Sequence, residues 1–138
     1  MSNEDTLEKI IAVITALMAE MESQAFADES FSQLSMRQMH YLNTITELEQ
    51  PTFSELAAAL GVTKPSVSAI VNTLIRKGFV QKVQDQDDLR VYHIILTPAG
   101  QQFGQLHDAV HQRLVNRLTA KLSEKEVATL TGILQKAI

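Results

Sequence analysis

The chain has 138 residues, of which 45% are hydrophobic and 20% charged, and its five glycines and three prolines favour one mostly helical globular domain over a turn-rich β fold. It has no cysteine, which excludes disulfides, thiolate metal sites and cysteine nucleophiles. Residues 1–53 carry two basic and nine acidic side chains, whereas residues 54–138 carry ten and seven, so the net charge of −4 hides a more basic second part.

The first part of the chain predicts two helices. Apolar residues recur at steps of three and four from Leu7 to Met21, which indicates an amphipathic helix over about residues 4–24. The stretch from Ser35 to Gln38 has the pattern of a capping box, in which a serine and a glutamine three residues later cap each other's backbone. It predicts that a second helix begins there.

A short helix and a tight turn are predicted next. Thr52 and Glu55 form a second capping box, and the helix that it opens stops at Gly61, since glycine is the residue that most readily ends a helix in a left-handed conformation. A very short strand is expected at Thr52 and Phe53, just before this helix.

The following segment changes from a helical to a strand period. Thr63 caps a further helix with Pro65 in its first turn, and Gly78 ends it. Residues 79–83 and 91–96 are rich in β-branched and aromatic side chains and flank an acidic turn, which predicts a two-stranded hairpin with a long tip.

The last part predicts two more helices. Thr97 and Pro98 open a long helix that runs to about Leu122, and a third capping box at Ser123 opens a final helix that ends near Ala137. The expected order is helix, helix, short strand, helix, helix, hairpin, helix, helix. This is a mainly α fold with a small β-hairpin wing, a winged helix-turn-helix.

The segment from Thr52 to Leu96 carries the candidate DNA-binding residues. The second helix of the turn starts with small polar groups that can approach a groove floor and phosphates closely, and the helix N-terminus adds its own attraction for phosphate. These candidates are Thr63, Lys64, Ser66, Ser68 and Asn72.

The chain resembles the MarR family of bacterial regulators over essentially its whole length. The resemblance rests on SELAAALGVTKPSVSAIVNTLIRKGFV, on the LTPAG that follows the hairpin, and on the Asp85-x-x-Asp88-Leu89-Arg90 element, which is similar to the D-x-x-D-R-R wing signature of that family. It implies one domain over 1–138, in which 1–34 and 98–138 form dimerisation helices and 35–97 form the DNA-binding lobe.

The resemblance also implies a function. A homodimer would place two recognition helices in successive major grooves of a palindromic operator and regulate transcription, most simply as a repressor. Thr63, Lys64, Pro65, Ser66, Ser68 and Asn72 then fall on the recognition helix, and Arg90 falls on the wing. Two positions depart from the family pattern, because Leu89 replaces the first wing arginine and Ala69 stands where a basic residue is common, so wing contact with the minor groove is in question.

Histidines at the ends of the predicted helices suggest an effector site. His107 and His111 are four residues apart and share one helix face. With His40 and Glu22 they match the zinc-uptake repressors of the MarR family, whose three imidazoles and one carboxylate suit tetrahedral zinc. A second site of that group does not carry over, since only Asp28 stands at a comparable position.

The sequence also allows other hypotheses for the effector and for the function. The stretches QMH and LHDAVHQRLV are also similar to the MarR branch that represses fatty-acid synthesis genes, whose signal is an acylated carrier protein, so the effector is zinc or an organic or acyl ligand. The net negative charge is also compatible with a winged-helix module that binds another protein and not DNA. We expect no enzyme, since H-E-x-x-H, G-x-S-x-G and phosphate-binding glycine loops are absent, and the lack of a long apolar run or signal peptide predicts a cytoplasmic protein without membrane contact.

Overall fold

The computed structural model describes residues 1–27 and 29–138, and Asp28 lies outside the described residues. The chain divides into two compact units. The terminal unit comprises Met1–Phe26 and His107–Ile138, and the central unit comprises Ala27–Leu106. The division falls inside one long helix, which contributes to both units.

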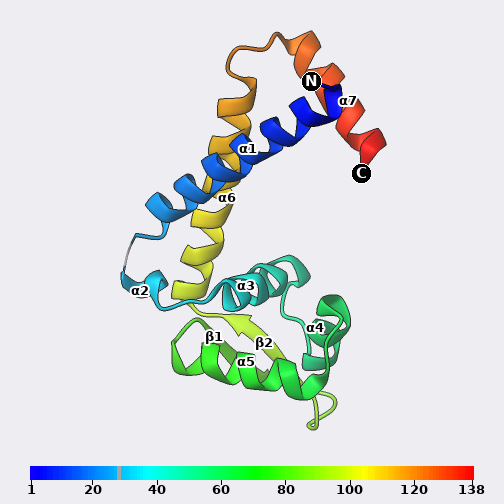
Figure 1. Cartoon of the computed structure of the whole chain (residues 1–138). Helices are drawn as coiled ribbons and strands as arrows, with labels where there is room; N and C mark the ends of the chain where they lie inside the picture. The colour runs from blue at the N-terminus through cyan, green and yellow to red at the C-terminus, as the bar shows by residue number, and fades with distance from the viewer. Residues whose placement is uncertain (28) are drawn as a thin grey trace. The chain divides into compact units, whose positions relative to one another are not determined.

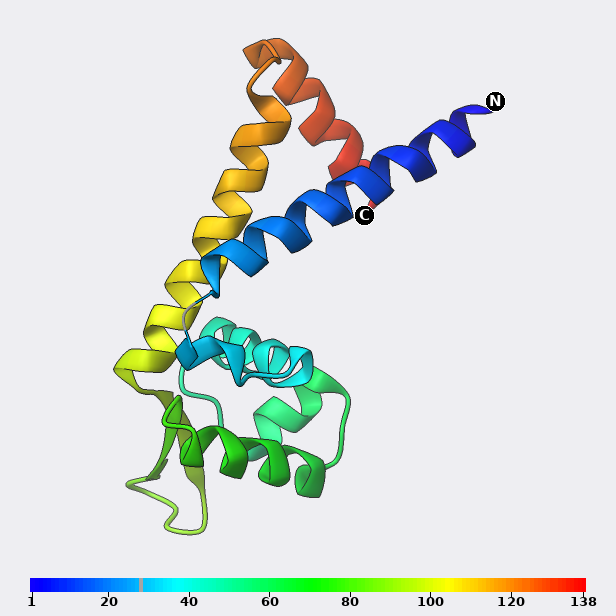
Figure 2. The ribbon, with the colours of Figure 1, turned by 60° about the vertical axis from the view of Figure 1, so that its left-hand side comes forward.

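The elements follow the predicted order with one addition (Figures 1 and 2). The structure has α1 (Asn3–Ala25), α2 (Glu29–Ser32), α3 (Met36–Leu48), α4 (Phe53–Leu60), α5 (Lys64–Arg76), β1 (Val80–Gln84), β2 (Tyr92–Leu96), α6 (Pro98–Thr119) and α7 (Glu124–Ala137). The one-turn helix α2 was not predicted, because four residues are too few to show a helical period. The mainly α winged helix-turn-helix is confirmed.

Reciprocal caps fix where several helices begin. The capping boxes predicted at Ser35, Thr52 and Ser123 are all formed, and in each the N-cap hydroxyl accepts a backbone N–H three residues on. A fourth box, Ser2 with Asp5, opens α1 one residue earlier than the apolar period indicated. The C-terminal end of α6 is at Thr119, three residues before the predicted end of that helix.

The core of the central unit lies between its helices and the hairpin. Three helices and one strand contribute fully buried apolar side chains to this core. They are Leu42, Leu56, Val67, Val71, Leu74 and Ile94. Phe31 adds aromatic contacts, with ring centroids 6.0 Å from those of Phe79 and Phe103. This packing holds α4, α5 and the hairpin in one rigid arrangement.

The hairpin is tied to the chain that precedes α4. Strands β1 and β2 pair antiparallel with Val80 opposite Leu96 and Gln84 opposite Tyr92. Thr52 forms an isolated antiparallel bridge with His93, and the Ile94 N–H donates to the Pro51 carbonyl at 2.8 Å. The very short strand expected at Thr52 is therefore present as a single bridge.

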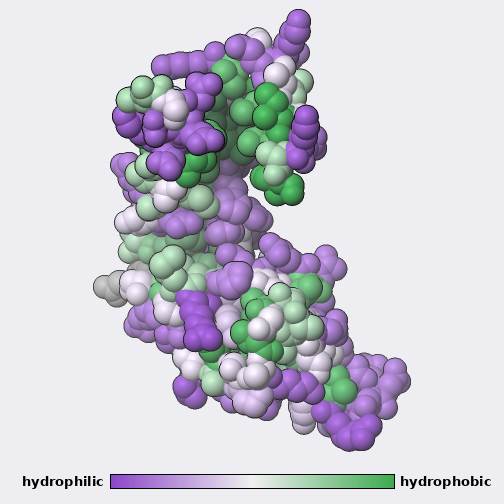
Figure 3. Space-filling view, turned by 45° about the vertical axis from the view of Figure 1, so that its right-hand side comes forward, coloured by the Kyte–Doolittle hydropathy of each residue, from purple (hydrophilic) through white to green (hydrophobic). Residues whose placement is uncertain are grey.

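The terminal unit exposes an apolar surface. Large apolar residues on α1, α6 and α7 and at the C-cap of α7 are 36% to 103% exposed, and they are Leu7, Ile10, Ile11, Val13, Val115, Leu118, Leu130, Ile133, Leu134 and Ile138. Figure 3 shows apolar side chains gathered over the helices of this unit. No single helix among the described residues is long and apolar enough to span a membrane.

Candidate nucleic-acid interface

A sharp turn orients α5 against α4. Gly61 ends α4 in the left-handed region at φ 66° and ψ 34°, a conformation that costs glycine little because it has no Cβ. Its N–H and that of Val62 donate to carbonyls of the last turn of α4. The two helices are bent by 110° at this break, which is the helix-turn-helix geometry that the sequence predicted.

The N-terminal turn of α5 is built from small polar groups. The Thr63 side chain accepts the Ser66 N–H at 3.3 Å, and the two hydroxyls lie 2.9 Å apart. Val67, Val71 and Leu74 bury the opposite face of the helix, so the polar positions point outward. Thr63, Lys64, Pro65 and Asn72 are exposed, and Ser66 and Ser68 are half-buried.

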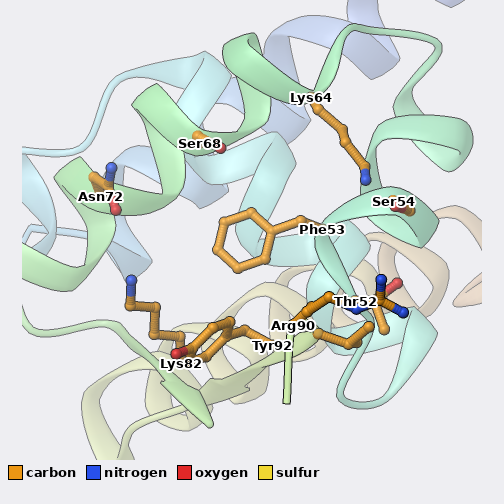
Figure 4. A pocket seen from close by; sticks show the side chains of 10 residues that line it. Thr52, Phe53, Ser54, Lys64, Ser68, Asn72, Lys82, Arg90 and Tyr92 are labelled. Atoms are coloured by element: carbon orange, nitrogen blue, oxygen red, sulfur yellow. The ribbon is translucent and has the colours of Figure 1, made fainter. Parts of the chain in front are cut away.

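A groove of about 390 Å³ runs between α5, the start of α4 and the hairpin. Figure 4 shows Ser68 and Asn72 on α5 along one side of the groove and Lys82 and Tyr92 on the other, with Phe53 between them. The lining residues are Thr52, Phe53, Ser54, Lys64, Ser68, Asn72, Lys82, Arg90, Val91 and Tyr92. Four of the sequence-predicted DNA contacts, from α5 and the wing, thus share this groove.

Sequence reasoning missed Lys82 and Tyr92 as candidates. Lys82 pairs with Ile94, so Tyr92 is its diagonal neighbour on the same face of the hairpin, and the ammonium group lies 5.1 Å from the Tyr92 ring centroid. This contact keeps the ammonium at the groove, where it joins Lys64 and Arg90. The signal for these residues was the strand alternation, which becomes informative only once the register is known.

Arg90 reaches the groove from the end of the wing loop. Its side chain is 90% exposed, and its Nε lies 3.1 Å from Asp88 Oδ1. The hydrogen bonds from Arg90 hold the pKa of Asp88 below its usual range. An exposed pair of this kind contributes little to stability, so Arg90 can exchange Asp88 for another anion at small cost. Leu89, one of the two departures from the family pattern, is 64% exposed beside it.

Asp85 organises the wing loop. Its Oδ2 accepts the backbone N–H groups of Asp87 and Asp88 at 3.0 and 2.9 Å, and its own N–H donates to the Val91 carbonyl at 2.8 Å. The bonds that the carboxylate accepts, together with one from His93, lower the pKa of Asp85, because each favours the ionised form.

His93 connects the wing loop to the chain before α4. Its Nε2 lies 2.7 Å from Asp85 Oδ1, and its Nδ1 lies 3.0 Å from the Gln50 carbonyl oxygen. The bond to Asp85, reinforced by the one to Gln50, raises the pKa of His93. Strand alternation alone predicts no more than a strand position for His93, because Gln50 is 43 positions away along the chain.

The four candidate zinc ligands belong to different units. His107 and His111 lie on α6 in the terminal unit, where their rings meet edge to face with centroids 4.3 Å apart. Glu22 is half-buried on α1 in the same unit, and His40 is exposed on α3 in the central unit. Within each unit, the described residues include no group of three His, Asp or Glu side chains arranged to hold a metal ion.

Known proteins resemble this chain in sequence. The MarR family model matches residues 34–92. The chain is 31% identical over 101 residues to the uncharacterized HTH-type transcriptional regulator YhjH of Bacillus subtilis (strain 168), a match that covers 71% of this chain and 58% of the relative. The chain spans between half and three fifths of the length of the curated relatives that it matches.

Solved structures resemble it over nearly its full length. The crystal structure of Streptococcus pneumoniae FabT in complex with DNA is 26% identical, with a TM-score of 0.80, and the match covers 99% of this chain and 94% of that one. The crystal structure of a mutant MarR from Escherichia coli complexed with operator DNA is 25% identical, with a TM-score of 0.61, and the match covers 96% and 94% of the two chains.

Proposed function

The chain belongs to the MarR family, and we propose that it is a transcriptional regulator that binds double-stranded DNA in a sequence-specific way. The observation that carries this proposal is the outward polar face of α5, which borders a groove lined by three cationic side chains, Lys64, Lys82 and Arg90. Both the FabT and the mutant MarR structures named above contain DNA. The Bacillus subtilis relative is named as a transcriptional regulator, in agreement with the expectation from the sequence that this chain is no enzyme.

The proposed contacts follow from this geometry. The outward face of α5 enters the major groove, where Ser68 and Asn72 contact base edges. Lys64, Lys82 and Arg90 hold the phosphate backbone along the neighbouring groove of the protein. Asp85, Asp87 and Asp88 on the wing loop offset part of this positive charge, so we expect a modest dependence of affinity on salt.

A homodimer is the second part of the proposal. The exposed apolar side chains of α1, α6 and α7 form a surface that water disfavours, and a second copy of the terminal unit would bury it in a symmetric interface. Two copies of α5 related by a two-fold axis would contact two half-sites, which makes the operator palindromic. A dimer bound over a promoter would exclude polymerase, and we propose that this chain represses transcription in that way.

Zinc is the proposed effector, and the resemblance implies Glu22, His40, His107 and His111 as its ligands, although Glu22, His107 and His111 are not gathered into a metal-holding group in the described terminal unit. The edge-to-face pair of His107 and His111 supports this proposal, since it places two imidazoles side by side on one helix. Bound zinc would act as a corepressor. Because imidazole must be neutral to bind the metal, zinc affinity falls as the pH is lowered.

A zinc titration against a chromophoric chelator tests this effector. The wild-type chain should bind one zinc per chain, and His107→Ala should weaken binding at least about tenfold. The matched control is Asp108→Asn, a change on the same helix at an exposed acid outside the ligand set. Equal zinc affinity of the wild type and His107→Ala would rule out zinc bound at this site as the effector. An organic or acyl effector would then be the remaining hypothesis.

Selection of duplexes from a random library tests the DNA-binding function itself. We expect enrichment of one palindromic motif and retardation of that duplex, but not of a scrambled one, in a gel. If no duplex is enriched with or without zinc, the chain is instead a protein-interaction module, for which the acidic wing loop and the exposed Leu89 would provide the surface.

A further inference from the structure

One imidazole joins three segments of the central unit. His93 lies on β2, where its backbone bridges Thr52, and its two ring nitrogens contact Asp85 in the wing loop and Gln50 in the turn after α3. The wing is therefore attached to the turn after α3 by the side chain of one residue as well as by backbone pairing.

Both partners of the His93 ring are hydrogen-bond acceptors. The Gln50 carbonyl has no proton to donate, and neither does an ionised Asp85 carboxylate. At 3.0 and 2.7 Å both ring nitrogens must donate. A neutral imidazole carries only one N–H, so the doubly protonated imidazolium alone satisfies both contacts.

The charges around His93 favour that cation. Asp85 contacts it directly, and Asp87 lines the same hollow beside the wing loop. Glu55 on α4 adds a weaker attraction. The hydrogen bonds to Asp85 and Gln50, with the charges of Asp85 and Glu55, raise the pKa of His93 in opposition to desolvation.

The turn that receives His93 is conformationally strained. Glu49 and Gln50 both have left-handed backbone angles, with φ of 52° and 55°, which cost a non-glycine residue about 1 kcal/mol or more each. Neighbouring bonds hold this turn against β2, from His93 to the Gln50 carbonyl and from the Ile94 N–H to the Pro51 carbonyl. Loss of one of them would let the turn relax.

Asp85 passes the position of His93 on to the DNA-facing side of the wing. One carboxylate oxygen contacts His93, and the other holds the N–H groups of Asp87 and Asp88. Asp88 in turn accepts both the backbone N–H and the guanidinium of Arg90. The chain of bonds thus runs from Gln50 through His93 to the arginine that lines the groove.

We propose that His93 is a positioning residue for DNA binding. As an imidazolium it fastens the wing loop to the turn after α3 and so holds Arg90 at the groove, and on losing one proton it releases one of the two partners. The proposal deepens the DNA-binding function proposed above and rests on it. In the metal-free protein and with Asp85 ionised, DNA affinity is therefore highest while His93 is doubly protonated and falls as His93 loses its proton.

Histidine NMR tests the attachment without DNA. Ring resonances of the four histidines are followed from pH 5 to pH 9 in wild type, Asp85→Asn and Asp87→Asn. We expect His93 to titrate above its ordinary value of about 6.5 in the wild type and to return toward that value in Asp85→Asn. Asp87→Asn is the matched control, because it removes the same charge from the same loop while the hydrogen bond that Asp87 donates comes from its backbone. Titration of the wild-type His93 at or below 6.5, or equal shifts in both variants, would overturn the proposal.

Binding to the selected duplex tests the consequence. At constant salt, wild-type affinity should fall about three- to tenfold between pH 6 and pH 9, since one hydrogen bond to a charged group is lost. His93→Gln should lose this dependence, Asp85→Asn should move its midpoint to lower pH, and Asp87→Asn should keep the wild-type profile. An unchanged profile in both His93→Gln and Asp85→Asn would overturn the positioning role. If His93 titrates as expected but no duplex is preferred at any pH, the attachment stands and the DNA-binding function is what fails.

Discussion

At the scale of single residues, cations on two elements meet at one groove. Lys64 comes from α5, whereas Lys82 and Arg90 come from the hairpin. Tyr92 holds Lys82 by a cation–π contact, and Asp88 holds Arg90 by an ion pair. Phosphate contacts of this kind position a protein on DNA without reading its sequence, so their loss should weaken binding to all duplexes alike.

Removal of the Lys82 charge should weaken binding to every duplex, if Lys82 contacts phosphate. In Lys82→Ala the affinity for selected and scrambled duplexes should fall by a similar factor, and the slope of log affinity against log salt should become shallower by about one. Lys125→Ala, which removes the same charge from an exposed site on α7, is the control and should leave both quantities unchanged. Anisotropy titrations at several salt concentrations measure them. A loss confined to the selected duplex would show that Lys82 contacts a base instead.

The pair formed by Asp85 and His93 also predicts how stability depends on pH. The lowered pKa of Asp85 stabilises the fold above about pH 4, and this contribution is lost as the pH falls through the folded-state pKa. The raised pKa of His93 stabilises the fold fully below about pH 6.5, and this contribution is lost as the pH rises through the folded-state pKa. Urea midpoints of wild type and Asp85→Asn should therefore differ most between these two limits. A difference that stays constant from pH 4 to pH 9 would contradict the pairing.

At the scale of elements, local signals predicted most of the fold. Capping boxes located the starts of α3, α4 and α7, and Gly61 located the turn, because each depends on residues only a few positions apart. The contacts that build the groove and anchor the wing depend on register and on partners far along the chain. Lys82 with Tyr92 and His93 with Gln50 are therefore visible only in the structure.

The junction between the hairpin and α6 offers a test of close packing. A Cβ on Gly100 would lie within 3.0 Å of the Phe79 carbonyl oxygen, whereas one on Gly104, a turn later on the same helix, would meet Thr46 at 3.6 Å. Gly100→Ala must displace backbone and should destabilise the fold by about 1–3 kcal/mol. Gly104→Ala, the matched control, should be neutral or stabilise by up to about 1 kcal/mol, because alanine favours helix. Thermal unfolding of both variants measures this difference in stability. Equal unfolding midpoints would contradict the close approach of Gly100 to the Phe79 carbonyl.

At the scale of the whole molecule, a homodimer would account for both the exposed apolar surface of the terminal unit and the polar face of α5. A monomer would leave apolar side chains of three helices in water and would contact one half-site only. A two-fold dimer resolves both, since it buries the apolar surface and doubles the contacts to DNA.

Sedimentation tests the dimer directly. The wild type should sediment at twice the chain mass of 15.3 kDa. Ile133→Glu, which introduces a charge into the exposed apolar surface of α7, should shift it toward the monomer and weaken operator binding. Met36→Glu places the same charge on an 86% exposed methionine of the central unit and should remain dimeric. A wild-type monomer at micromolar concentration would contradict the proposed assembly.

The ratio of affinities for the selected and the scrambled duplex tests the central claim most directly. The claim is that the outward face of α5 reads base sequence, so the wild type should prefer the selected duplex by at least about a thousandfold at physiological salt. Asn72→Ala should reduce that ratio about tenfold or more while affinity for the scrambled duplex stays the same. A wild-type ratio near one, or a ratio that Asn72→Ala and Ser68→Ala both leave intact, would contradict the assignment of α5 as the recognition helix.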